Sequence, residues 1–299
     1  MIVVYAFIGK LPSYCIETVH QLRIFYSGEV YFIVSDYESE HITVLESKYN
    51  TKIIRYDAVV DNKFLSTVAS AEHKFYHMPT LHGREDLFIR AFERFYVLSN
   101  FMGRKHTDVF FLELDNLIYD NPEKWLNSFR TKEMAYMFDN YQRYSSGICY
   151  IKNNQILEGF LVECTNFIET ATSFMTEMTV LYKFYEQNKL DVQILPTHWM
   201  DRIYPPQTYE NFDLYDSIFD ALSMGIYICG IDLCHSNGTL ETKRKNPWGL
   251  IDYTKYTYVW VTHENYGKIP YVRYADKLIR INNLHVHSKD LKSHLSLPL

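Results

Sequence analysis

The sequence contains little cysteine, and no arrangement of it that would bind zinc or form a disulfide framework. Its five cysteines are odd in number, lie scattered over 299 residues and include no CxxC pair. Structural zinc sites and disulfide scaffolds both depend on closely spaced or paired cysteines. We therefore expect neither, and we expect the chain to work in a reducing compartment.

The chain also lacks an excess of positive charge and a long apolar run. Its net charge is −6, whereas broad nucleic-acid binding requires a basic face. A membrane-spanning helix needs about 20 apolar residues, and the apolar start at residues 2–7 is too short and too strand-like for a signal peptide or an anchor. We expect no nucleic-acid partner, no membrane span and a cytoplasmic location, which for a viral chain is the host cytoplasm.

What is present is the composition of a globular protein, with 47% hydrophobic and 22% charged residues. No repeat, low-complexity segment or linker interrupts it, so we expect a single domain over residues 1–299. Tyrosine (26) and phenylalanine (19) are unusually frequent. Aromatic rings suit stacking against sugars, although we expect most of these rings to fill the core.

Strand-like and helix-like segments alternate along the first part of the chain. Strands are expected at residues 2–7, 30–34 and 52–55, with helices from about residue 13 and near 41–49. This alternation predicts an α/β fold with a mostly parallel sheet and helices on both faces. Phe7, Gly9 and Asp36 lie where strands end, the edge at which such sheets bind ligands, so they are candidate nucleotide contacts. For Asp36, an exposed turn residue is an equally good interpretation.

The most informative stretch begins with four large apolar residues at 109–112, which predict a strand buried on both faces. Glu113 and Asp115 follow at once, and we expect both on one side of an extended chain. Two such carboxylates repel each other unless a cation lies between them, and oxygen ligands suit Mg²⁺ or Mn²⁺. The alternative interpretation is a pair of solvated turn residues.

The segments around this stretch supply further charged candidates. A helix expected over residues 86–102 carries Arg90 and Arg94 on its polar face, and guanidinium groups pair well with phosphate. Surface ion pairing is the alternative, which we prefer for Arg90. In residues 57–84 the apolar residues show no clear helical or strand-like periodicity, and a loop over the site is one interpretation. Further strands are expected at residues 134–138, 148–151, 191–195, 256–261 and 277–282, with helices at 156–169 and from Glu177 to about 185.

The order of these parts resembles that of GT-A glycosyltransferases, in which an Asp-x-Asp motif holds a metal, and most of all the glycogenin and bacterial galactosyltransferase group. The resemblance spans about residues 1–290 and rests on these positions: Arg94, Glu113-Leu114-Asp115, Ser146-Gly147, Glu177, Leu195-Pro196, His287 and Lys289. The segments at 219–225 and 283–289 also resemble viral and microbial glycosyltransferase-like proteins. The chain departs from the group in having Glu113 for aspartate and in placing Pro247-Trp248 before the histidines.

The resemblance implies a GT-A (Rossmann-like) domain with a nucleotide-binding half over residues 1–120 and an acceptor-binding half over 121–299. The implied activity is transfer of a sugar from a nucleoside-diphosphate sugar to a glycan or another hydroxyl acceptor. Glu113, Asp115 and either His285 or His287 would hold a divalent cation, with Mn²⁺ favoured over Mg²⁺ by a histidine ligand. Arg94 and Lys289 would face the leaving diphosphate.

The acceptor hydroxyl must lose its proton, and an inverting enzyme uses a carboxylate for this. Glu177 is our first candidate and Asp220 the second, although a helix N-terminus also favours an acidic residue such as Glu177 for its dipole alone. A retaining enzyme would need no such base. A catalytically silent nucleotide-sugar-binding module remains open. A sugar-nucleotidyltransferase is disfavoured, because residues 9–12 are a poor match to its glycine-rich loop.

Overall fold

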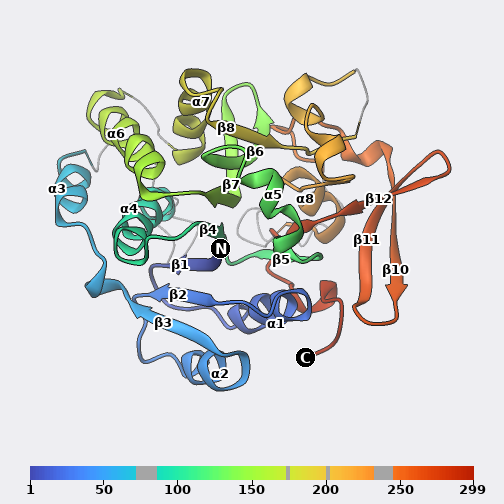
Figure 1. Cartoon of the computed structure of the whole chain (residues 1–299), viewed down its shortest axis with the longest axis horizontal. Coiled ribbons are helices and arrows are strands. Elements are labelled where there is room, and N and C mark those ends of the chain that lie inside the picture. Colours follow the sequence, from blue (N-terminus) through green and yellow to red (C-terminus); the bar gives the residue numbers. More distant parts are fainter. Residues whose placement is uncertain (72–85, 173–175, 200–202, 232–244) are drawn as a thin grey trace.

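The computed structural model describes residues 1–71, 86–172, 176–199, 203–231 and 245–299. Its centre is a seven-stranded sheet in the order β3-β2-β1-β4-β7-β6-β8, in which β7 alone runs antiparallel to its neighbours (Figure 1). This confirms the expected α/β fold with a mostly parallel sheet. The strands are β1 (Ile2–Phe7), β2 (Val30–Val34), β3 (Thr51–Arg55), β4 (Val109–Leu112), β6 (Met134–Asn140), β7 (Arg143–Ile151) and β8 (Val192–Leu195).

Helices cover both faces of this sheet, as expected. Neighbouring strand residues alternate between two buried clusters: Val4 and Phe111 pack in one, Val3 and Phe110 in the other. The first cluster contains side chains of α3 (Asn62–Ala71), α4 (Leu87–Lys105), α6 (Asn154–Thr170) and α7 (Glu177–Gln187), and the second those of α1 (Cys15–Phe25), α2 (Glu40–Tyr49) and α5 (Leu126–Phe129). Burial on both faces explains the continuous apolar runs of β1, β2 and β4.

Two smaller sheets complete the part of the fold that the structure describes. Strands β10 (Thr257–His263), β11 (Gly267–Tyr274), β12 (Lys277–Ile281) and β9 (Ser217–Ile218) form a four-stranded sheet to one side of the main one (Figure 1). The short strands β5 (Asn116–Ile118) and β13 (Asn283–His285) pair antiparallel. This small pair joins the segment after β4 to the end of the chain, which positions the candidate site.

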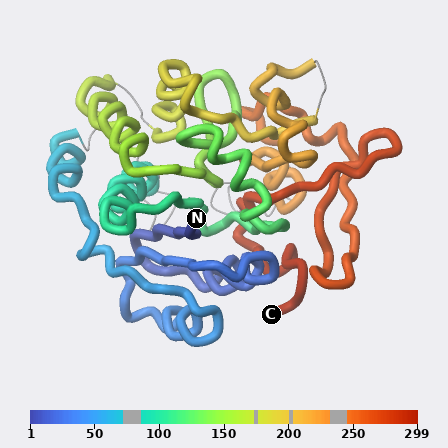
Figure 2. The backbone as a smooth tube through the Cα atoms, viewed as in Figure 1, coloured from blue at the N-terminus to red at the C-terminus, as the bar shows by residue number. Residues whose placement is uncertain are grey.

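The last residues of the chain return to the first helix. The side chain of Gln21 in α1 donates to Ser296 Oγ (2.9 Å) and accepts from the Ser296 backbone N–H (2.8 Å). Figure 2 shows the C-terminal end of the tube beside this N-terminal helix. None of the helices in the described part of the chain combines the length and apolar character needed to cross a bilayer.

The structure corrects two expectations about local structure. Part of the segment 57–84, for which a loop over the site was one interpretation, forms helix α3, which buries Phe64, Val68 and Ala71. Residues 72–84 lie outside the described part of the chain. Strand β7 begins at Arg143 rather than at residue 148, because residues 143–147 continue the hairpin with β6. The sequence analysis also missed strand β11.

Candidate active site

The acidic pair lies in a tight turn directly after β4. The backbone N–H of Asn116 donates to the carbonyl of Glu113 (3.1 Å), which closes the turn. Leu114 is buried in the apolar cluster below, and its carbonyl accepts from the Thr18 hydroxyl. The expectation of an extended Glu-x-Asp segment is therefore wrong. The two carboxylates meet because the chain bends around the buried Leu114.

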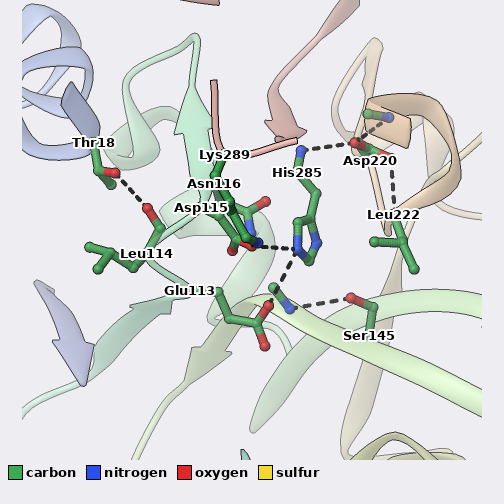
Figure 3. Close-up of polar contacts among 12 residues, drawn as sticks. Thr18, Glu113, Leu114, Asp115, Asn116, Ser145, Asp220, Leu222, His285 and Lys289 are labelled. Carbon is green, nitrogen blue, oxygen red and sulfur yellow. Dashed lines mark hydrogen bonds and ion pairs between the residues drawn. The ribbon is translucent and has the colours of Figure 1, made fainter. Parts of the chain in front are cut away.

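Pairing of β5 with β13 brings His285 to these carboxylates. His285 lies opposite Asn116 in the register, and its Nε2 is 3.2 Å from Asp115 Oδ2 and 3.8 Å from Glu113 Oε2. Figure 3 shows the imidazole pointing toward both acidic side chains. One ligand atom from each of Glu113, Asp115 and His285 lies within 4.8 Å of the other two. Two carboxylates and an imidazole are a donor set that can hold a divalent cation.

The second histidine, His287, lies beside this group but does not belong to it. Its backbone N–H donates to the carbonyl of His285 (2.9 Å), and the two rings are 6.3 Å apart between centroids. Both rings line the same cavity. Of the two histidines, the structure places His285 against the acidic pair.

Two cationic side chains flank the acidic pair. Lys289 Nζ contacts Asp115 Oδ2, and Arg94 Nη2 is 2.9 Å from Glu113 Oε1. Burial alone would raise the pKa of Asp115, but His285 and Lys289 outweigh burial and hold it well below its usual range. Burial alone would lower the pKa of His285, but Asp115 outweighs it and raises this pKa to about 9.

Glu177 lies near the same Arg94 nitrogen that contacts Glu113. It is the first residue of α7, which is capped by the Thr176 hydroxyl, and its Oε1 is 3.8 Å from Arg94 Nη2. Only 6% of Glu177 is exposed. Burial raises its pKa to about 7, although Arg94 acts in the opposite direction. The carboxyl group can therefore take up or release a proton near neutral pH.

Asp220 has a different environment, because both of its carboxylate oxygens accept backbone N–H groups. Oδ1 accepts from Leu222 (3.0 Å) and Met224 (3.1 Å), at the start of the short helix α8 (Ser223–Cys229). Oδ2 accepts from Gly225 (2.8 Å) and from His285 (2.9 Å). Burial raises the pKa of Asp220 to about 6 despite these bonds. Its carboxylate joins the start of α8 to the strand that carries His285.

A cavity of about 770 Å³ lies at the carboxyl ends of β1 and β4 and is lined by the acidic pair, the two histidines and the charged residues beside them. Its size is within the range of ligand-binding pockets. The expected site residues on its wall are Phe7, Gly9, Arg94, Glu113, Asp115, Glu177, His285, His287 and Lys289. Asp36 and Asp220 do not line it. The Asp36 carboxylate accepts from the backbone N–H of Leu11 (3.0 Å) and holds the segment after β1.

The cavity wall also contains residues that the sequence analysis did not assign to the site. Arg143 and Ser145 come from the start of β7, and residues 245–248 enter from the C-terminal half. Arg143 Nε donates to the buried Asp139 (2.6 Å). Within the second segment, Pro247-Trp248 is a visible signal in the sequence. No sequence pattern marks Arg143.

No protein-family model matches the chain, and no curated protein matches it by sequence. Among solved structures, it is similar to mouse xyloside xylosyltransferase 1 in its apo form, with 11% identity over 72% of this chain and 92% of that one, at a TM-score of 0.46. The glycosyltransferase GlyE of Streptococcus pneumoniae TIGR4 gives 13% identity over 65% of this chain and 45% of that one, at 0.41. The PaToxG glycosyltransferase gives 13% over 62% and 68%, at 0.40.

Proposed function

We propose that the protein is a metal-dependent glycosyltransferase that moves a sugar from a nucleoside diphosphate to a hydroxyl of a glycan or another acceptor. The observation that supports this best is the meeting of Glu113, Asp115 and His285 in one cavity, flanked by Arg94 and Lys289. An acidic and imidazole centre for a cation, beside fixed positive charge, suits a reaction that releases a diphosphate.

Glu113, Asp115 and His285 would hold the cation, and Arg94 and Lys289 lie beside it as fixed positive charges. When bound, the cation would act as a Lewis acid on the leaving phosphate oxygens, and the histidine ligand favours Mn²⁺ over Mg²⁺. Lys289 and Arg94 now contact Asp115 and Glu113. Their positive charge stabilises the additional negative charge that the leaving group acquires as its bond to the sugar breaks.

The nucleoside end of the donor belongs at the end of β1. Phe7, Gly9 and Lys10 line this part of the cavity, and Gly9 has φ +123°, a conformation that side chains rarely adopt. Its backbone N–H donates to Ser35 Oγ (2.8 Å). We assign Phe7 and Gly9 to nucleoside contact, and Asp36 to holding this loop through Leu11.

Glu177 is the base in an inverting reaction. The acceptor hydroxyl transfers its proton to the Glu177 carboxylate while its oxygen bonds to the anomeric carbon, and the bond from that carbon to the phosphate oxygen breaks with its electrons moving to the diphosphate. A pKa of about 7 suits this task near neutral pH. Asp220 positions His285 and does not act as a second base, because its oxygens are occupied by backbone N–H groups.

Calorimetric titration with UDP, GDP, CDP and ADP, each with and without MnCl₂, tests the donor site. We expect one nucleotide to bind, and to bind much more tightly with the metal. Hydrolysis or transfer of the matching nucleotide sugar then tests catalysis. Binding without any turnover would identify a silent nucleotide-sugar-binding module, and absence of binding for every nucleotide would contradict the proposal.

A further inference from the structure

One wall of the cavity carries an exposed tryptophan. Trp248 is 74% exposed and lines the cavity, whereas Trp125 and Trp199 are buried and Trp260 is half-buried. A tryptophan that leaves this much apolar surface in water is unusual, because its burial elsewhere would be favourable by the hydrophobic effect. Its position therefore calls for a partner that covers the indole.

The backbone of Trp248 is held firmly although its side chain is exposed. Its N–H donates to Asn246 Oδ1 (3.1 Å), and its carbonyl accepts from Asn140 Nδ2 (3.2 Å). The buried Asn246 donates to Ser223 Oγ (2.9 Å) at the first residue of α8. A Cβ added at Gly249 would lie 2.2 Å from the same Ser223 Oγ, so a larger residue there would displace the Ser223 side chain that Asn246 contacts. The indole is thus presented on a fixed backbone.

The position of Trp248 assigns it to the acceptor side of the proposed reaction. Strand β4, which leads to Glu113 and Asp115, lies between β1 and β7 in the sheet. The β1 side contains the proposed nucleoside contacts. The Trp248 carbonyl accepts a hydrogen bond from Asn140, which lies at the end of β6 and near the start of β7. Trp248 thus lies on the side of the acidic pair that is opposite to β1.

The chemistry of this side of the cavity fits a saccharide. One face of a sugar ring presents C–H groups that pack on a flat aromatic ring, while its hydroxyls need polar partners at the ring edge. Arg143, Ser145 and Asn246 line the cavity together with Trp248. A second exposed aromatic residue, Tyr141, lies next to Asn140 in the β6–β7 turn and is 58% exposed.

We propose that Trp248 is the stacking platform for a carbohydrate acceptor, so that the acceptor hydroxyl belongs to a glycan. This rests on the proposed function for its role in transfer, but saccharide binding to Trp248 can be measured without it. The alternative acceptor class, a hydroxyl or amide of a protein side chain, has no requirement for an aromatic platform and becomes one outcome of the test.

The test follows tryptophan emission while the full chain is titrated with lactose, maltose, cellobiose, chitobiose and xylobiose. We expect at least one disaccharide to shift the emission of the wild-type protein, and we expect Trp248→Ala to abolish this shift. The control is Leu190→Ala, which should retain the shift, because Leu190 is 84% exposed and does not line the cavity. Trp248→Phe should retain binding of that disaccharide, measured by calorimetry, while Trp248→Ala weakens it about tenfold. Affinity for whichever of UDP, GDP, CDP and ADP binds the wild type should be the same in both variants.

Three results would overturn this proposal: no disaccharide changes the emission, the change survives in Trp248→Ala, or transfer occurs to a serine- and tyrosine-containing peptide and to none of the disaccharides. A wild-type protein that binds no nucleotide contradicts the proposed function instead. Because the emission titration contains no nucleotide, it still decides whether Trp248 binds saccharides in that case.

Discussion

The carboxylate of Asp220 accepts the backbone N–H of His285 at 2.9 Å, and the two residues lie 65 positions apart in the chain. The same oxygen accepts from Gly225, so one buried side chain connects the start of α8 with the strand that presents the imidazole. Figure 3 shows Asp220 on the opposite side of His285 from the acidic pair. His285 is therefore fixed through its backbone on one side and faces Asp115 with its ring on the other.

Asp220→Asn should weaken metal binding without touching any proposed ligand. The new amide would point N–H groups at backbone donors, which displaces His285. We expect the affinity for Mn²⁺, titrated in the presence of the nucleotide that binds, to fall about 10- to 100-fold, as for other residues that support a metal ligand. Asp216→Asn is the control, because Asp216 is exposed and asparagine tolerates its positive φ of 47°. Unchanged Mn²⁺ affinity in a folded Asp220→Asn protein would contradict the role of Asp220.

Gly225→Ala should disturb the same connection by steric conflict. A Cβ at Gly225 would lie 2.1 Å from the carbonyl oxygen of His285 and 2.5 Å from Asp220 Oδ2. We expect the free energy of unfolding in urea to fall by about 1–3 kcal/mol, together with a loss of Mn²⁺ affinity. Gly103→Ala in α4 is the matched control, since its nearest contact would be an ordinary 3.6 Å and alanine favours helix by about 0.5–1 kcal/mol. Equal stability of the two variants would refute the steric account.

Asp115→Asn should remove the metal-dependent part of nucleotide binding. Asp115 contacts both His285 and Lys289, and its carboxylate is one of the three proposed metal ligands. We expect calorimetry to show the same weak nucleotide affinity with and without MnCl₂. The exposed Asp213 offers the control Asp213→Asn, which should behave as wild type. Retention of the full response to MnCl₂ would exclude Asp115 as a ligand.

Glu177→Gln should lower turnover and leave donor binding intact. Glutamine keeps the size of the side chain but cannot accept the proton of the acceptor hydroxyl, and general-base catalysis typically contributes about 10²–10⁴-fold. Nucleotide affinity should be unchanged while kcat for transfer falls by that order. Glu186→Gln, at the exposed end of the same helix, is the control. Normal transfer by Glu177→Gln would remove Glu177 from the mechanism, as in a retaining reaction.

The same residue predicts how stability depends on pH. Burial raises the pKa of Glu177 from 4.5 to about 7, so between these values the folded chain holds a proton that the unfolded chain releases. The groups facing Glu177 are Arg94 from α4, Glu113 after β4 and Cys164 from α6. The free energy of unfolding should fall as pH rises from 4.5 through 7, by at most about 3 kcal/mol from this group.

Urea denaturation at pH 5 and pH 8 measures this dependence. The stability difference between Glu177→Gln and the wild type should move in favour of the variant at pH 8, because glutamine carries no charge that burial penalises. A difference that is the same at both pH values would show that Glu177 does not titrate in this window.

The sequence allowed the central sheet and the acidic pair to be predicted, because both depend on local pattern. The four apolar residues of β4 are buried on both faces, and the carboxylates follow where the strand must end. The turn at Leu114 was not predicted, since the apolar pattern continues through residues 117–118 and conceals the break between β4 and β5.

The choice between His285 and His287 could not be made from sequence. Both belong to one His-x-His segment, and the register of three residue pairs between β13 and β5 decides which ring meets Asp115. That register is set by contacts such as the one from Asn283 Nδ2 to Asn116 Oδ1 (2.8 Å), between residues 167 positions apart. Arg143 was missed, and Trp248 was not assigned to the site, for a similar reason, because the fold alone brings their segments to the cavity.

The pairing of β13 with β5 has a consequence for the order of events on the ribosome. Asp115 leaves the exit tunnel long before His285, which lies 170 residues later, and chains are made at about 5–20 residues per second. The carboxylates thus spend many seconds without their imidazole, and a nascent chain interrupted before β13 cannot assemble the centre. Any chemistry that requires the imidazole of His285 is in this way delayed until β13 has been synthesised.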